Sequence, residues 1–297
     1  MSIDKINILI SLHKGYGLGD AVQMSTVLRH AVAARSHWVT DFQAEDGKQW
    51  VGSGIVDKVF AYGEPYPRDH YDAEVQIRLY DTWANWGDRP NTRVCSCLHE
   101  QFGLGWKPEY GRYHISVSQK ALDLVRWRLK AFGSRDFIAI HYEGDSSQAK
   151  KNLNTDQAAR ICVEIDKLGY SPLILDWRRR STLECCKLQS PEKWGGNAET
   201  VCAVISQCKA FVGIDSGPSK CASATNTPAA VIWTGHHPAP FHDPAPNTTH
   251  IVPIGYHGLD PVCNDVGVIN WFEENYNVLK YVGDPVSIVT QWLRRML

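Results

Sequence analysis

The stretch "KAFVGIDSGPSKCASATNTPAAVIWTG", residues 209–235, decides the fold. It reads as an apolar strand over 209–215, a turn of Ser, Gly and Pro, a helix of small residues over 219–225, and a second apolar strand over 228–235. Two β-rich runs joined by a helix form the unit of a parallel sheet covered by helices. The sequence therefore predicts an α/β protein.

The same alternation recurs on both sides of residue 133. Further strands are predicted at 6–12, 37–42, 56–62, 73–79, 136–144 and 171–177, and helices at about 119–132 and 197–208. Apolar residues three and four positions apart predict two more helices, one after the first strand and one closed by Gly169. A chain of 297 residues exceeds the usual single domain. We expect two Rossmann-like domains facing a central cleft, residues 1–133 and 134–297, with the last helix a candidate to pack back on the first domain.

Composition narrows the classes of function. The net charge is −1 and is evenly spread along the chain, which argues against nucleic acid as a partner because that partner favours a basic face. The apolar run near the start is too short for a signal peptide or a membrane span. We expect a cytoplasmic protein with at most peripheral membrane contact.

Cysteine and histidine clusters do not follow a metal-binding pattern. The nine cysteines are an odd number scattered along the chain, which favours reduced thiols. Cys95 and Cys97, and the pair Cys185 and Cys186, lack a second pair at zinc-finger spacing. Three histidines in residues 233–244 also lack a metal motif. The prediction is therefore no metal and no cofactor.

The turn after the strand at 209–215 is the most specific signal. Asp215 ends the strand, and the backbone N–H groups of Ser216 and Gly217 open the helix, with Lys220 one turn further on. Small side chains let a ligand approach a helix N-terminus, where N–H groups favour an anion. This turn is predicted to bind phosphate, although a tight turn needed only for packing is the alternative.

A second polar loop follows the strand at 136–144. In "HYEGDSSQAKKNLN", residues 141–154, the hydroxyl of Ser147 and the ammonium group of Lys151 are suited to grip a diphosphate. The alternative is a solvated loop without a ligand.

The first loop, "HKGYGLGDAVQ" at residues 13–23, contains glycines and one carboxylate. Gly15, Gly17 and Gly19 do not have the spacing of a dinucleotide fingerprint, and Asp20 would repel a pyrophosphate. Glycine at this turn allows backbone to approach a ligand closely. Asp20 is either a helix N-cap or a catalytic carboxylate.

Residues 80–118 show no clean period. Trp83, Arg89 and Arg93 are candidates to stack on a sugar and pair with acids of an acceptor. Tryptophans that pack the domain and arginines that are solvated are the alternative.

Three of these segments together resemble glycosyltransferase family 9, the heptosyltransferases that use ADP-heptose. They are "GLGDAVQMSTVLRHA" at 17–31, "KKNLN" at 150–154, and the long segment from "AETVCAV" to "WTGHHP" at 198–238. The resemblance covers essentially the whole chain and implies the GT-B fold of two Rossmann-like domains.

The resemblance also implies roles for single residues. Asp20 corresponds to the catalytic base, and Lys151 to a lysine that contacts donor phosphate. Asp215, Ser216 and Gly217 correspond to a turn that holds the diphosphate, and Lys220 replaces the family's histidine. Gly19 and Ser147 complete the predicted donor site.

The expected activity is that of an inverting, metal-independent glycosyltransferase, most simply one that moves a heptose from ADP-heptose to a saccharide, a glycoside or a protein. A GT-B sugar-nucleotide epimerase is a second reading, with Glu143 and Asp145 as its carboxylates. A sugar-nucleotide-binding protein without turnover is a third. An NAD-dependent oxidoreductase is disfavoured because the chain lacks the fingerprint with its distal acid.

Overall fold

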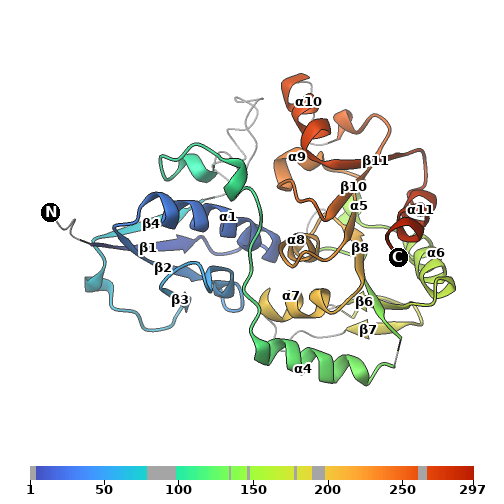
Figure 1. The fold of residues 1–297 in the computed structure, drawn as a ribbon, viewed down its shortest axis with the longest axis horizontal. Helices are drawn as coiled ribbons and strands as arrows, with labels where there is room; N and C mark the ends of the chain where they lie inside the picture. The colour runs from blue at the N-terminus through green and yellow to red at the C-terminus, as the bar shows by residue number, and fades with distance from the viewer. Residues whose placement is uncertain are drawn as a thin grey trace.

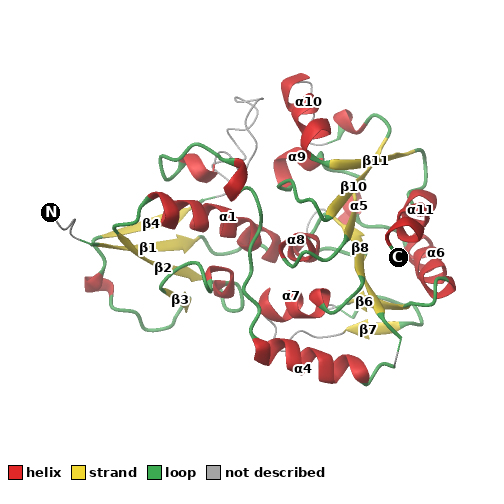
Figure 2. Ribbon diagram, viewed as in Figure 1, coloured by secondary structure: helices red, strands yellow, loops and turns green. Residues whose placement is uncertain are grey.

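The chain forms two parallel sheets flanked by helices (Figure 1, Figure 2). The computed structural model describes residues 5–78, 98–133, 135–145, 148–176, 179–188, 198–259 and 266–297. The predicted class, α/β with two Rossmann-like domains, is confirmed.

The first sheet contains β1 (Ile6–Leu12), β2 (Trp38–Ala44), β3 (Lys58–Ala61) and β4 (Ala73–Ile77). Its strands are parallel and lie in the order β3-β2-β1-β4. Helix α1 (Leu18–Ala34) connects β1 to β2. The chain reverses direction of winding between β1 and β4, so the carboxyl ends of these two strands mark the crevice where such sheets bind ligands.

The second sheet has seven parallel strands in the order β11-β10-β9-β8-β5-β6-β7. They are β5 (Phe137–His141), β6 (Ser171–Leu175), β7 (Cys186–Leu188), β8 (Ala210–Ile214), β9 (Ala229–Ile232), β10 (Thr248–Pro253) and β11 (Asn277–Tyr281). Here the winding reverses between β5 and β8. The loops after these two strands are those that the sequence selects as phosphate-binding candidates.

The remaining helices are α4 (Gln119–Lys130), α5 (Gln148–Lys151), α6 (Thr155–Lys167), α7 (Ala198–Ser206), α8 (Gly217–Ala224), α9 (Pro238–Phe241), α10 (Val266–Asn275) and α11 (Val286–Met296). The α8 helix begins at Gly217, two residues before the predicted start, because Pro218 fits the first turn of a helix and Ser216 is its extended cap. None of the helices described in these ranges is long and apolar enough to cross a membrane.

Helix α4 departs from the expected division at residue 133, whereas the last helix stays on its own side of it. Helix α4 lies against α7 (Figure 1), with the Ser118 N–H donating to Glu199 Oε1 at 2.8 Å and Arg126 Nε donating to Gln207 Oε1 at 3.0 Å. The last helix, α11, packs on α6 and β11 rather than on the N-terminal half. It therefore covers the second sheet, because its buried side chains complete the apolar cluster above β5 and β8.

A single buried apolar cluster joins the two sheets. It runs from Ile10 and Leu28 in the first half, through Cys221 and Ala222 of α8, to Phe211 in the second half. The contact between α1 and α8 is the centre of this junction (Figure 1). The two carboxyl-end loops are therefore held in fixed positions relative to one another by packed side chains.

Candidate functional site

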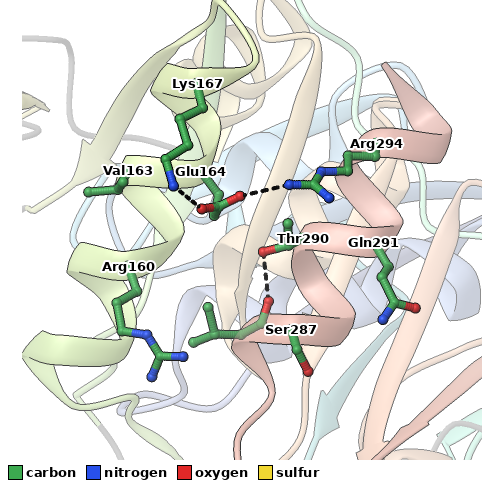
Figure 3. Close-up of a pocket in the computed structure, with 9 residues that line it drawn as sticks. Arg160, Val163, Glu164, Lys167, Ser287, Thr290, Gln291 and Arg294 are labelled. Atoms are coloured by element: carbon green, nitrogen blue, oxygen red, sulfur yellow. Dashed lines mark hydrogen bonds and ion pairs between the residues drawn. The ribbon is translucent and has the colours of Figure 1, made fainter.

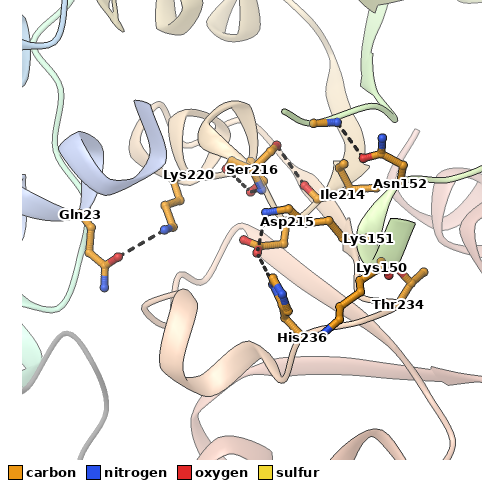
Figure 4. A network of polar contacts seen from close by, with 12 residues as sticks. Gln23, Lys150, Lys151, Asn152, Ile214, Asp215, Ser216, Lys220, Thr234 and His236 are labelled. Atoms are coloured by element: carbon orange, nitrogen blue, oxygen red, sulfur yellow. Dashed lines mark hydrogen bonds and ion pairs between the residues drawn. The ribbon is translucent and has the colours of Figure 1, made fainter. Parts of the chain in front are cut away.

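The candidate site lies where the β5 and β8 loops meet the N-termini of α1 and α8 (Figure 4). Asp215 follows β8 directly and is 6% exposed. Lys151 ends α5, after the β5 loop, and is 8% exposed. The fold thus brings together two predicted donor-site residues that are 64 positions apart (215 − 151).

Asp215 lies between a lysine and a histidine. Its Oδ2 lies 3.7 Å from Lys151 Nζ and 3.5 Å from His236 Nδ1. His236 comes from the loop after β9, where its ring stacks on Phe241. From the sequence, His236 is a candidate only as a metal ligand, whereas the structure places it beside the Asp215 carboxylate.

The ionisation state of Asp215 follows from these neighbours. Burial alone would raise its pKa, but His236, Lys151 and Lys220 outweigh burial and hold the pKa of Asp215 well below its usual range. Asp215 is therefore a carboxylate across the physiological pH range. A buried carboxylate of this kind holds the Lys151 and His236 side chains in position beside the start of α8.

The start of α8 is built from small polar groups. Ser216 is the cap residue, and its N–H donates to Ser219 Oγ at 3.2 Å, while its own hydroxyl donates to the Ile214 carbonyl at 3.1 Å. In the structure the Ser216 hydroxyl stabilises the turn by binding the Ile214 carbonyl. Its predicted contact with phosphate stays a prediction. The helix dipole at this end favours negative charge.

Helices α1 and α8 approach each other through glycine. A methyl group built on Gly19 would lie 3.2 Å from the Gly217 nitrogen, and one built on Gly217 would lie 2.9 Å from Leu18 Cβ. Only residues without a side chain allow this approach, which brings both helix N-termini to one place.

Lys220 connects α8 to α1. Its Nζ donates to Gln23 Oε1 at 3.2 Å, and both side chains are buried, at 5% and 2% exposed (Figure 4). Gln23 lies one turn beyond Asp20 on α1. No local sequence pattern distinguishes Gln23, because its partner Lys220 lies 197 positions away.

Asp20 is the third residue of α1 and not its N-cap. The cap position belongs to Gly17, whose N–H donates to Asp20 Oδ2 at 2.8 Å. The alternative that Asp20 is the helix N-cap is therefore wrong, because the cap is Gly17, three residues earlier. An acid at the third helical residue reaches back to the cap backbone, as in one half of a capping box. This bond engages one carboxylate oxygen, and Asp20 itself stays partly exposed.

The β5 loop contains two further carboxylates, those proposed for an epimerase. Arg180 pairs with both, at 3.2 Å from Asp145 Oδ1 and 3.9 Å from Glu143 Oε2. Its backbone N–H also donates to Asp176 Oδ1 at 2.8 Å. Because Arg180 offsets the negative charge of Glu143 and Asp145, its ion pairs favour a structural role for these carboxylates over proton transfer to a sugar.

The end of "KKNLN" has structural roles. Asn152 Oδ1 accepts from the Gly144 N–H at 2.8 Å and closes the β5 loop. Asn154 caps α6 by accepting from the Gln157 N–H at 2.8 Å. These bonds hold Lys151 at the end of α5. Ser147 lies outside the described residues.

The predicted acceptor residues Trp83, Arg89 and Arg93, and the cysteines Cys95 and Cys97, also lie outside the described residues. Within the described ranges, no three His, Cys, Asp or Glu side chains group as metal ligands. His237 and His242 are buried, and burial lowers the pKa of each to about 4.

A surface groove between α6 and α11 is distinct from this site (Figure 3). Lys167 and Arg294 both pair with Glu164, at 2.7 and 3.2 Å, and Arg160 pairs with Asp284 at 2.6 Å. The groove cations are exposed, at 51% for Arg160, 64% for Lys167 and 62% for Arg294, so solvent screens them more than the buried lysines at the start of α8.

Two Rossmann-like domains with facing helix N-termini define the GT-B class of fold. Solved structures of glycosyltransferases share it over nearly the whole chain. The glycosyl transferase family 9 protein of Veillonella parvula aligns with a TM-score of 0.68 at 12% identity, covering 100% of this chain and 98% of that one.

Two further structures are similar. ADP-heptose LPS heptosyltransferase II of E. coli aligns with a TM-score of 0.56 at 13% identity, covering 97% of this chain and 100% of that one. The iron-containing dodecameric glycosyltransferase TibC of enterotoxigenic E. coli aligns with a TM-score of 0.60 at 14% identity, covering 84% of this chain and 63% of that one. No protein-family model and no curated protein matches the sequence. The structural likeness establishes the fold that the sequence resemblance implied.

Proposed function

We propose that this protein is a glycosyltransferase that moves a sugar from a nucleoside-diphosphate donor to an acceptor hydroxyl. The observation that supports it is the meeting of α1 and α8. Asp20 lies on one helix, and Lys220, with the Asp215-ordered Lys151, lies beside the start of the other. Glycosyl transfer needs a base for the acceptor and cations for the leaving group, and this arrangement supplies both.

The donor diphosphate is assigned to the N-terminus of α8. Backbone N–H groups there, with Lys151 and Lys220, would stabilise the charge that develops on the leaving group. Lys220 would exchange its bond to Gln23 for one to phosphate. Heptose from ADP-heptose is the favoured donor, because a similar structure is an ADP-heptose heptosyltransferase.

The base is assigned to Asp20. The Gly17 N–H orients one carboxylate oxygen, and the other would take the proton of the acceptor hydroxyl. The acceptor oxygen then bonds to the anomeric carbon while the bond from that carbon to the phosphate oxygen breaks. Attack opposite the leaving group inverts the anomeric carbon. Since Lys151, Lys220 and the helix N-terminus can balance the diphosphate, the reaction is proposed to need no metal.

The acceptor is assigned to the carboxyl edge of the first sheet. There Lys14 lies over the Tyr62 ring, with Nζ 5.1 Å from its centre. Trp83, Arg89 and Arg93 stay predictions for the same role. A saccharide, a glycoside and a protein are all compatible with this edge.

The test is nucleoside-diphosphate release from a panel of ADP- and UDP-sugars with candidate acceptors, with and without chelator. We expect an ADP-sugar to be turned over in chelator. Asp20→Asn should lower kcat by at least about a hundredfold while leaving donor affinity within a few fold. Asp46→Asn, an exposed acid in the same domain, is the matched control and should behave as the parent.

Four outcomes would count against parts of this proposal. Activity that chelator abolishes contradicts metal independence. Activity that survives in Asp20→Asn contradicts the assigned base. Donor binding without turnover for every acceptor supports a binding protein, and isomerisation of the donor sugar supports an epimerase.

A further inference from the structure

Helix α4 presents an apolar strip to the outside of the molecule. Trp127 is 71% exposed and Leu124 is 38% exposed, and the exposed Phe132 follows just beyond the helix end. The opposite side of the helix, with Val125 and Leu129, is buried toward α7. Trp127, with Leu124 three residues before it on the same helix face, makes α4 a candidate interaction surface.

Most of the charged residues of α4 are basic. Helix α4 contains the cations Lys120, Arg126, Arg128 and Lys130 against a single acid. That acid, Asp123, accepts hydrogen bonds from Gln119 at 2.8 Å and Arg126 at 3.3 Å. The helix itself therefore has a formal charge of +3 (4 − 1), on a chain whose overall charge is −1.

We propose that α4 docks this protein on the surface of an anionic lipid bilayer. Tryptophan and leucine on one helix face, flanked by lysine and arginine, suit a helix that lies in the membrane interface with its cations at lipid phosphates. Helix α4 lies at the lower margin of the molecule in Figure 1, beyond α7 and away from the α1 and α8 junction. Docking through it leaves the loops of the candidate site unobstructed, and it does not depend on glycosyl transfer.

Charge favours lipid over a protein partner. A protein would need acidic residues placed opposite each lysine and arginine, whereas an anionic bilayer meets cations anywhere along the helix. The helix is 12 residues long, too short to span the bilayer. The contact is therefore peripheral and sensitive to salt.

The test is co-sedimentation of the full chain with vesicles of phosphatidylglycerol or of phosphatidylcholine at low salt. We expect binding to phosphatidylglycerol vesicles and at least tenfold weaker binding to phosphatidylcholine vesicles. The double variant Lys120→Gln/Lys130→Gln should lose about thirtyfold in affinity, the factor that two cations near a charged bilayer supply. Trp127→Ser should also release the protein from the vesicles with an unchanged melting temperature, since its side chain is exposed.

Matched variants on other faces separate this surface from general charge and hydrophobicity. Lys5→Gln/Lys58→Gln removes two exposed lysines of the first sheet, and Val282→Ser removes a valine that is 77% exposed. Both should bind vesicles as the parent does. Equal binding to the two lipids overturns the proposal, as does an α4 variant that binds unchanged. Self-association that Trp127→Ser abolishes, without vesicle binding, also overturns it and identifies a protein interface instead.

Discussion

At the scale of single residues, Asp215 is the side chain on which the phosphate end of the proposed site depends. Asp215→Asn leaves Lys151 and His236 buried without their carboxylate. Removing one partner of a buried pair costs roughly 3–5 kcal/mol of unfolding free energy. We expect a loss of that order by urea denaturation, together with weaker donor binding by calorimetry.

Asp136 supplies the control for this substitution. Its pair with Lys209, at 3.3 Å, involves side chains that are 62% and 55% exposed. Asp136→Asn should therefore change the unfolding free energy by less than about 1 kcal/mol. If both asparagine variants are equally stable, Asp215 does not hold the lysine in place.

A second residue-scale prediction concerns thiol reactivity. The neighbouring thiol of Cys162 on α6 lowers the pKa of Cys185, and the ammonium group of Lys187 adds to the effect. Burial raises the pKa of Cys208 to about 12. Alkylation by iodoacetamide, followed by mass spectrometry from pH 6 to 9, should label Cys185 at lower pH than Cys208. Cys162→Ala should shift the labelling of Cys185 to higher pH, and an unshifted profile would contradict the pairing.

At the scale of elements, the approach of α1 to α8 is the feature that sequence patterns did not reveal. Gly217→Ala places a methyl group 2.9 Å from Leu18 Cβ and 3.0 Å from the Gly19 nitrogen. Backbone cannot give way as a flexible side chain does, so the helices must separate. We expect turnover to fall by at least about tenfold, because small displacements of reacting groups are costly.

Gly105→Ala is the control for that change. No heavy atom lies within 4 Å of a methyl group built there, so both turnover and stability should match the parent. A Gly217→Ala protein with normal kcat would show that transfer does not need the observed spacing of the helices.

The elements themselves were predicted to different degrees. Apolar spacing located α6, because Ala158, Ile161 and Ile165 are all buried on one face. It did not locate β7, which is only three residues long, or β10, β11 and α10, which follow the segment where the predicted elements end. In the site, Asp20, Lys151, Asp215 and Lys220 were selected by loop position. Neither His236 beside Asp215 nor Gln23 beside Lys220 follows from a local pattern, since each contact is made by tertiary packing.

At the scale of the whole molecule, buried histidines set the response to acid. Burial lowers the pKa of His141, His237 and His242 to about 4, and that of His250 well below its usual value. In the unfolded chain these side chains protonate near pH 6.5. As pH falls below that value, these histidines bind protons in the unfolded state but stay neutral in the native state. The free energy of unfolding therefore decreases between about pH 6.5 and 4.

Urea denaturation at pH 7, 6 and 5 measures this effect. Each such histidine should remove roughly 1.4 kcal/mol of unfolding free energy per pH unit within that window. His242→Gln should reduce the slope, whereas His70→Gln, at an exposed position, should leave it unchanged. Equal stability at pH 7 and pH 5 would contradict the buried neutral state of these histidines.

The cytoplasmic location that the sequence leads us to expect stays a prediction.

The packing of α4 on α7 also determines how the two halves could be exchanged between related enzymes. A hybrid cut at residue 133 would take α4 from the incoming N-terminal half, and the native contacts of Ser118 with Glu199 and of Arg126 with Gln207 would be lost. A cut before Ser118 would keep α4 with its own neighbour and transfer only the first sheet and α1. The proposed acceptor preference should then follow the shorter segment. The surface to be matched would comprise the face that α1 presents to α8, the Gly47 carbonyl that accepts from the Ala198 N–H, and the Tyr113 hydroxyl that accepts from the Asp243 N–H.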